Sequence, residues 1–244
     1  MKQIVKFIIG IMIILFLIYG FQSLSRLEED VGQSAQEDKK QELFHQNKDV
    51  FAWLTVDGTE INYPVAQHPS DDSYYLSHDL DDNETYYGAI FTELVNSKTL
   101  EDPVTIIYGH AITDDSMFGS LDYFADEKFF KDHSLIRIET ADKQYEYEIM
   151  AAHRYTDDHL FHTYALGSKE GLSHYIMTLK DRVMTYGGSY RQLPVDLAED
   201  KFLILSTCDA VTDTQRYIVT ARLFSIRERK GECGLFLTYQ SFGG

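Results

Sequence analysis

Residues 201–224 read KFLILSTCDAVTDTQRYIVTARLF, and this stretch decides the fold. Its first run, Phe202–Thr207, is almost continuously apolar, which is typical of a strand buried on both faces. The chain leaves through polar residues at 209–215 and returns in a second β-rich run that begins at Arg216. The simplest geometry is an antiparallel hairpin, in which one strand ends where its neighbour begins. The sequence therefore predicts that Cys208 and Arg216 lie together at one edge of a sheet.

A thiol beside a fixed cation has the setting that lowers a cysteine pKa and produces a nucleophile. Arg222 has the same strand parity as Arg216, but at roughly 3.3 Å per residue it lies about 20 Å further along the strand. Arg216 is therefore the better partner for the thiol. Two other interpretations of the residues stay open. One is a half-buried structural Cys208, and the other is a disulfide to Cys233, which would stabilise the fold by about 3 kcal/mol.

A cysteine nucleophile usually works with an imidazole. Of the nine histidines, only His110 directly follows a strand-like run, in VTIIYGH at 104–110, where the glycine predicts a turn that leaves the ring at an edge. The other histidines lie in polar loops or helices, where a surface position is the default. His159 and His162 are closely spaced, but no carboxylate or thiol set completes a zinc site around them. The residues thus favour His110 as the partner of Cys208, with no metal.

The part of the chain after residue 50 is rich in short β-type runs separated by turn residues, a pattern typical of a barrel or a sandwich. The predicted strands are Ala52–Val56, Glu60–Val65, Val104–Tyr108, Leu135–Glu139, Tyr145–His153, Phe202–Thr207 and Arg216–Ile226.

Two helical insertions interrupt these strands. The first is expected over Ser116–Phe130, with Met117, Leu121 and Phe124 on one face. The second is expected over Ser168–Tyr186 and should end at Gly187-Gly188. Its apolar positions at helical spacing are Leu172, Ile176, Leu179, Val183 and Tyr186. We therefore predict a mainly β domain with helical insertions.

The amino-terminal run FIIGIMIILFLIYGF (7–21) carries no charge and approaches the roughly 20 residues that a membrane-spanning helix needs. Lys2 and Lys6 precede it and acidic residues follow, so the positive-inside rule predicts a cytoplasmic head and an exported remainder. A cleaved signal peptide is the alternative, although no clear small-x-small cleavage site follows. A buried core helix is the third possibility.

The expected organisation is a cytoplasmic head at 1–6, a transmembrane signal anchor at 7–24 and a polar helical stalk at 25–49. The β-rich domain follows at 50–226, and the tail at 227–244 has no assignment.

The amino-acid composition excludes several classes of function. Lys and Arg number 22 against 39 Asp and Glu, which gives a net charge of −17 and argues against nucleic-acid binding. With 44% hydrophobic residues, the chain can form a substantial core. Two cysteines exclude a disulfide-rich scaffold and a four-thiolate zinc site.

With these residues in view, the exported part resembles a sortase, and specifically a class B sortase, one of the membrane-anchored cysteine transpeptidases of Gram-positive cell surfaces. LSTC alone is a weak motif, but LSTC with an upstream YGH and an arginine eight residues downstream is strong. The matching pieces are INYPVAQ (61–67), DSYYLSHD (72–79), IIYGH (106–110), MFGSLDYFADEKFF (117–130), LSTC (205–208) and RYIVTARL (216–223).

The resemblance implies the eight-stranded sortase β-barrel, and the insertion at 168–186 matches the helix that class B carries between its sixth and seventh strands. Carried over by position, it implies that Cys208 is the nucleophile and that His110 is the general acid. Arg216 would hold the substrate carbonyl and the developing oxyanion. Ser206 and Leu76 would line the substrate groove.

The resemblance also implies partners and a reaction. The substrates would be surface proteins with a C-terminal sorting signal of the Asn-Pro-x-Thr-x type, cleaved through a thioester. The acceptor would be an amine of a lipid-linked peptidoglycan precursor at the cell membrane, and no metal or organic cofactor would be needed. Three alternatives remain: a pilin-polymerising sortase with a lysine acceptor, a cysteine endopeptidase with water as acceptor, and a non-catalytic anchored adhesin.

The membrane anchor leads to a first prediction. With residues 1–26 removed, the protein should be soluble and active on peptides, because the apolar run is left out. The full-length chain should sediment with membranes and expose residues after 27 to external protease. Protection of the domain inside the cytosol would contradict the predicted orientation.

Overall fold

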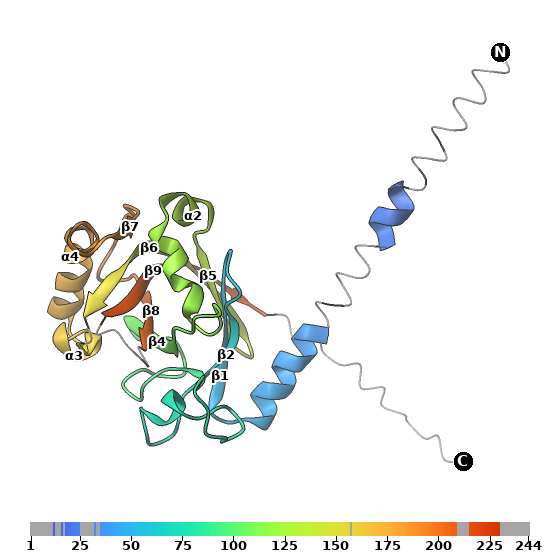
Figure 1. The fold of residues 1–244 in the computed structure, drawn as a ribbon, viewed down its shortest axis with the longest axis horizontal. Helices are drawn as coiled ribbons and strands as arrows, with labels where there is room; N and C mark the ends of the chain where they lie inside the picture. The colour runs from blue at the N-terminus through green and yellow to red at the C-terminus, as the bar shows by residue number, and fades with distance from the viewer. Residues whose placement is uncertain are drawn as a thin grey trace, which may run out of the picture. The chain divides into compact units, whose positions relative to one another are not determined.

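The structure of the chain is a computed structural model, and it describes residues 12, 16, 18–24, 32, 35–156, 158–208 and 215–229 (Figure 1). The chain divides into two compact units, Met1–Gln46 and Asn47–Gly244. In the first unit, residues 18–24 and 35–46 are helical.

The predicted membrane span at 7–24 lies mostly outside the described residues. Within the described part of the chain, no helix combines the length and the apolar character needed to cross a membrane.

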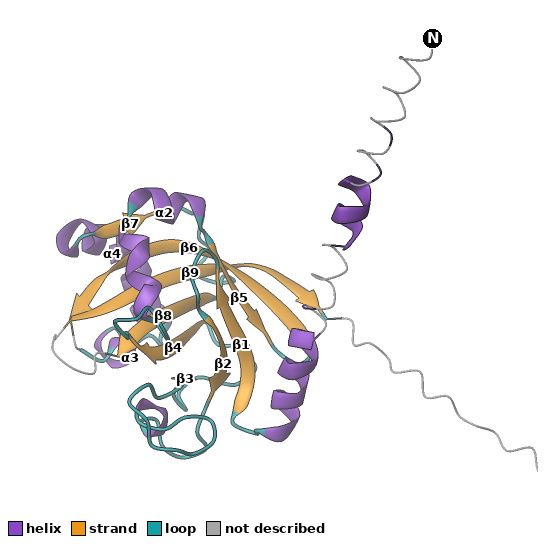
Figure 2. Cartoon of the chain, turned by 45° about the vertical axis from the view of Figure 1, so that its right-hand side comes forward, coloured by secondary structure: helices purple, strands orange, loops and turns teal. Residues whose placement is uncertain are grey.

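The second unit is a single curved sheet of nine strands (Figure 2). The strands are β1 (Val50–Val56), β2 (Asn62–Ala66), β3 (Ile90–Phe91), β4 (Val104–His110), β5 (Leu135–Glu139), β6 (Lys143–Thr156), β7 (Gly188–Tyr190), β8 (Phe202–Cys208) and β9 (Gln215–Glu228). Their order is β5-β1-β2-β3-β4-β8-β9-β6-β7, and β5 also pairs with β6. That second pairing closes eight of the described strands into a barrel and leaves β7 attached outside, along β6. The expected eight-stranded barrel is confirmed.

All seven predicted strands are present, and β4, β6 and β9 run longer than their sequence patterns indicated. The sequence missed β3 and β7, because two or three residues are too few to show an alternating pattern. The double burial expected for β8 is also confirmed. Leu203 and Leu205 join the main hydrophobic core, while Phe202 and Ile204, of the opposite parity, are equally buried.

The insertion after β6 contains α3 (Leu160–Thr163) and α4 (Lys169–Tyr186). Ser168 caps α4 by accepting a hydrogen bond from the Gly171 amide, and Gly187 ends the helix at a φ of 77°. The buried face of α4 includes Leu172, Ile176, Leu179 and Val183, as predicted. Tyr186 is 46% exposed, so its assignment to that face is wrong.

The single helix predicted over 116–130 is also wrong. The segment forms a 3-10 helix, η2 (Gly119–Ala125), and a short α2 (Glu127–Asp132). Asp126 separates them in an extended conformation and caps α2 through the Phe129 amide. Met117 precedes η2 with a φ of 54°, although it is buried as expected. The apolar spacing indicated burial correctly, but local capping by Asp126 divides the helix.

A side chain completes the β8–β9 pairing where the backbone ladder ends. The ladder runs from Phe202↔Arg222 to Ser206↔Ile218. One residue beyond it, the amide of Tyr217 donates to Thr207 Oγ1 at 2.8 Å in a buried position. The Thr207 hydroxyl thus replaces a backbone acceptor beside the strand ends.

This contact predicts that Thr207→Val destabilises the protein by about 1–3 kcal/mol, because the buried Tyr217 amide loses its acceptor with little change in side-chain shape. Thr207→Ser keeps the hydroxyl and should retain most of the stability. Urea unfolding at constant m-value would measure both. Equal stability of Thr207→Val and the wild type would mean that the amide finds another acceptor.

Candidate functional site

The candidate site lies where β4 and β8 end side by side. These strands are parallel and pair residue for residue, from Val104↔Phe202 to His110↔Cys208. Neighbouring strands lie about 4.8 Å apart. The backbones of His110 and Cys208 are therefore adjacent, although the side chain of Cys208 lies outside what the structure describes.

His110 reaches this position without a turn, which corrects the expectation from the glycine before it. β4 continues through Gly109 to His110. A Cβ at position 109 would lie 2.3 Å from Ile90 Cδ1 and 3.1 Å from the Phe118 ring. Glycine is needed here because β4 packs closely against neighbouring side chains.

The imidazole of His110 is held by the segment before β3. Its Nε2 lies 2.7 Å from the carbonyl oxygen of Leu76, at the end of η1 (Tyr74–Leu76), and the residue is only 6% exposed. A carbonyl oxygen can only accept, so this contact keeps a proton on Nε2. The Tyr86 ring stacks at 6.4 Å between centroids. These contacts set the tautomer and the orientation of the ring.

Arg216 enters the site from the neighbouring strand. Continuing the β8–β9 register past Ser206↔Ile218 places Arg216 opposite Cys208, as the hairpin predicted. On its other side, Arg216 pairs with Tyr155 of β6. None of the ion pairs between described residues includes Arg216. Among the described residues, its guanidinium thus lines a cavity without a carboxylate partner.

His110 and Arg216 both line a cavity of about 340 Å³. Its described lining consists of Asp72, Ser73, Leu76, Phe91, Glu93, Tyr108, His110, His159 and Arg216. Of the residues expected at the site, Leu76, His110 and Arg216 face this space. Ser206 is 1% exposed, pairs with Tyr108 and Ile218, and is not among the described lining residues.

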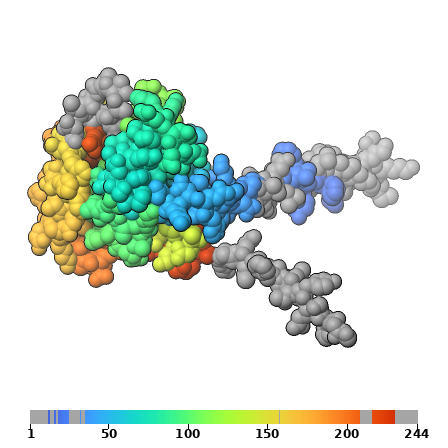
Figure 3. Space-filling view, turned by 90° about the horizontal axis from the view of Figure 1, so that it is seen from below, coloured from blue at the N-terminus to red at the C-terminus, as the bar shows by residue number. Residues whose placement is uncertain are grey.

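The cavity is also lined by two polar residues that the sequence did not predict there, Glu93 and His159. His159 Nε2 lies 2.8 Å from Glu93 Oε1, and the Tyr108 hydroxyl donates to Glu93 Oε2 at 3.1 Å. This pair joins the segment between β2 and β4 to the one after β6, whose green and yellow surfaces adjoin in Figure 3. The sequence drew notice to His159 only through its spacing to His162, and Glu93 belongs to no motif, so nothing in the sequence indicated that the two meet. In the described part of the chain, no three His, Cys, Asp or Glu residues form a group suited to a metal ion.

Comparison with known proteins assigns the family. The sequence model of the sortase domain matches residues 54–224. The chain belongs to the sortase family. Sortase B of Listeria monocytogenes is 31% identical over 179 residues, which are 73% of this chain and 70% of the relative.

Solved structures agree with this assignment. A class B sortase of Streptococcus pyogenes has a TM-score of 0.64 and 28% identity, covering 75% of this chain and 96% of that one. A Staphylococcus aureus sortase B–substrate complex has a TM-score of 0.66, covering 81% and 98%; at 24% identity it supports the fold. The protein is a class B sortase, and this family consists of cysteine transpeptidases.

The sortase places its two candidate arginines in different surroundings. Arg216 lines the cavity, whereas Arg222 pairs with Phe202 at the other end of the ladder. There it lies 3.7 Å from Asp200 Oδ2 and donates to the carbonyl of Pro194.

We expect Arg216→Ala to reduce kcat/KM by about 10²- to 10³-fold, the usual effect of removing one oxyanion donor. Arg216→Lys should recover part of this loss, because it keeps the charge but not the planar fork. Arg222→Ala, the matched control, should lower the thermal midpoint instead. A larger loss of kcat/KM in Arg222→Ala at unchanged stability would contradict this assignment.

Proposed function

We propose that this sortase cleaves a C-terminal sorting signal of the Asn-Pro-x-Thr-x type after the threonine and joins the surface protein to a cell-wall amine. The observation that carries the proposal is the in-register pairing of His110 with Cys208, beside a cavity that Arg216 also lines. Nucleophile, acid and oxyanion donor would then come from three neighbouring strands. Leu76 would line the groove, and Ser206 would back it from β8.

In the proposed reaction, the Cys208 thiolate attacks the threonine carbonyl, and Arg216 donates to the oxygen that gains negative charge. The C–N bond breaks as His110 gives its proton to the leaving amine. A thioester remains on Cys208. An acceptor amine then attacks this thioester, loses a proton to His110, and releases the thiolate. The two half-reactions leave both residues as they began.

This cycle requires a cationic His110 at the same time as an anionic Cys208. The Leu76 carbonyl supports the cationic partner, because it accepts from an Nε2 that stays protonated throughout. The proton transferred in the cycle would then be the one on Nδ1.

The cavity also suits an extended peptide with an apolar residue. Leu76 and Phe91 offer apolar surface, while Asp72, Ser73 and Glu93 add polar groups along the same space. We propose that residues 7–24 anchor the enzyme, with the catalytic domain outside the cell.

A second acceptor class is favoured by one relative. The S. pyogenes class B sortase, 28% identical, is described as involved in pilus biogenesis. A lysine side chain of a pilin subunit would use the same thioester. The two possibilities differ only in the acceptor, so both can be tested in one assay.

The test is to incubate the domain with Asn-Pro-x-Thr-x peptides and amine acceptors, and to read the products by mass. Cys208→Ala should abolish cleavage while the domain still folds, because no thioester can form. Cys233→Ala should stay near wild type. Loss of turnover in Cys233→Ala, with the two cysteines disulfide-bonded, would overturn the nucleophile assignment. Release of only the shortened peptide, with a free carboxyl on its threonine and no joined amine, would instead indicate an endopeptidase.

A further inference from the structure

The chain just before β3 is joined to η1 on both sides of the Leu76 carbonyl. The amide of Thr85 donates to the carbonyl of Ser77 at 2.8 Å. The amide of Ala89 donates to the carbonyl of Tyr75 at 2.9 Å. These two acceptors are the residues directly before and after Leu76. The carbonyl oxygen that contacts the imidazole of the proposed general acid therefore lies between two backbone hydrogen bonds.

Gly88 is the point at which this part of the chain comes close to both η1 and the imidazole. Its φ is +59°, in the left-handed region that glycine adopts readily. A Cβ at this position would overlap the carbonyl oxygen of Tyr75. It would also lie 3.0 Å from the Leu76 carbonyl oxygen and 3.2 Å from His110 Cδ2. A side chain at position 88 would thus press on the carbonyl and on the ring that this carbonyl contacts.

The surroundings of Gly88 are anchored in the core. Tyr75 is 2% exposed, and its hydroxyl donates to Asp49 Oδ2 at 2.8 Å. On the other side, Ala89 is buried and leads directly into β3. Leu76 is only half-buried. Because close-packed groups resist displacement, an added side chain would move the Leu76 carbonyl first.

We propose that Gly88 is a positioning residue for the general acid: without a side chain there, the Leu76 carbonyl reaches Nε2 of His110 and orients the ring for proton transfer to the leaving amine. Tyr86 holds the same ring from outside, since it is 56% exposed and stacks on the imidazole at an interplanar angle of 12°. The inference rests on the proposed function. It adds two residues that act through His110 and are not among the described residues lining the cavity.

The test compares two substrates with the same Asn-Pro-x-Thr acyl part, a peptide amide and a peptide thioester. The leaving amine of the amide needs a proton, whereas a thiolate leaves without one. In the full-length protein, Gly88→Ala should lower kcat/KM for the amide by about 10²-fold, the usual cost of a displacement of about 1 Å. The value for the thioester should fall far less. A distorted groove would lower both values equally, and equal losses would overturn the proposal.

Gly58→Ala is the matched control for backbone strain. Gly58 lies between β1 and β2 with a φ of +77°, and a Cβ there would overlap the His133 ring. This variant should lower the thermal midpoint and keep the wild-type ratio of the two kcat/KM values. A change of that ratio in Gly58→Ala would mean that strain alone explains the effect, which would also overturn the proposal.

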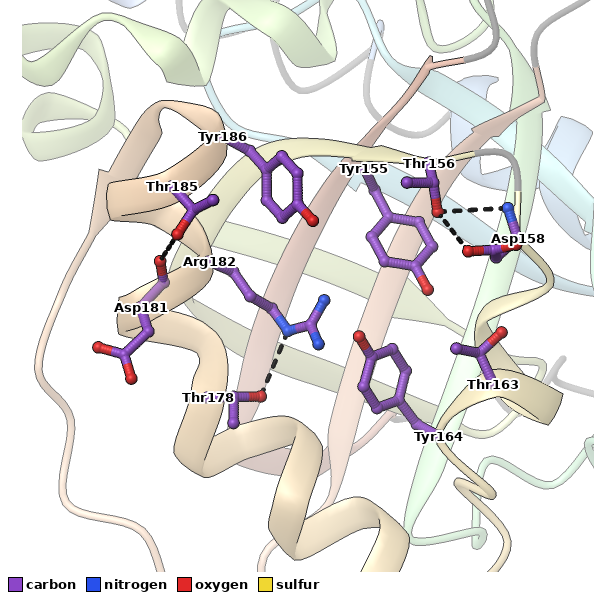
Figure 4. Close-up of a pocket in the computed structure, with 10 residues that line it drawn as sticks. All are labelled: Tyr155, Thr156, Asp158, Thr163, Tyr164, Thr178, Asp181, Arg182, Thr185 and Tyr186. Carbon is purple, nitrogen blue, oxygen red and sulfur yellow. Dashed lines mark hydrogen bonds between the residues drawn. The ribbon is translucent and has the colours of Figure 1, made fainter.

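A second variant tests the proposal if Gly88→Ala does not fold. Tyr86→Leu changes an exposed position and should lower kcat/KM for the amide alone by up to about 10-fold, the equivalent of one aromatic pair. Tyr86→Phe keeps the ring and should restore the value. Tyr186→Leu, the control, changes an exposed tyrosine of α4 that lines a different cavity (Figure 4) and should keep the wild-type ratio. A wild-type ratio in Tyr86→Leu would contradict the role of its ring.

A spectroscopic measurement separates this inference from the proposed function. In Cys208→Ala, nitrogen-15 NMR of the neutral His110 ring should show the proton on Nε2, because the Leu76 carbonyl accepts from it. Adding Gly88→Ala should give a mixture of the two tautomers, and adding Gly58→Ala should not. If the wild type cleaves neither substrate, the proposed function fails while this comparison still tests Gly88. An unchanged tautomer in the Gly88→Ala variant would overturn the positioning role.

Discussion

The structure depends on the parallel ladder between β4 and β8. Seven residue pairs in register bring His110 beside Cys208, although the two residues are far apart in the sequence. The side-chain period of a strand is two, so a slip of one residue would turn the buried set of β8 away from the core. Because Leu203 and Leu205 are completely buried, such a slip would cost several core contacts. Core packing thus sets the geometry of the site.

The register of β8 also positions the residues of the neighbouring strand. The β8–β9 hairpin carries the register to Arg216, and Thr207 supports the last step through the Tyr217 amide. The β6–β9 pairing then connects Arg216 to Tyr155.

Arg216 and Arg222 have the same strand parity, but they differ in their neighbouring groups. Arg222 has Asp200 and the Pro194 carbonyl as partners, whereas Arg216 has no carboxylate partner among the described residues. Arg222 is therefore held by neighbouring groups of the fold, whereas a guanidinium at a cavity without such a carboxylate can bind a ligand. On another side of the cavity that Arg216 lines, His159 and Glu93 contact each other.

The sequence by itself determined the β-rich domain, the doubly buried β8, the hairpin to Arg216 and the buried face of α4, because each follows from local periodicity. It also selected Cys208, His110 and Arg216, mainly through motifs. Only the tertiary structure decided that Gly109 serves close packing, that the Leu76 carbonyl holds His110, and that Glu93 and His159 meet. These contacts join segments distant in the chain, and no local pattern records which distant residues the closed barrel brings together.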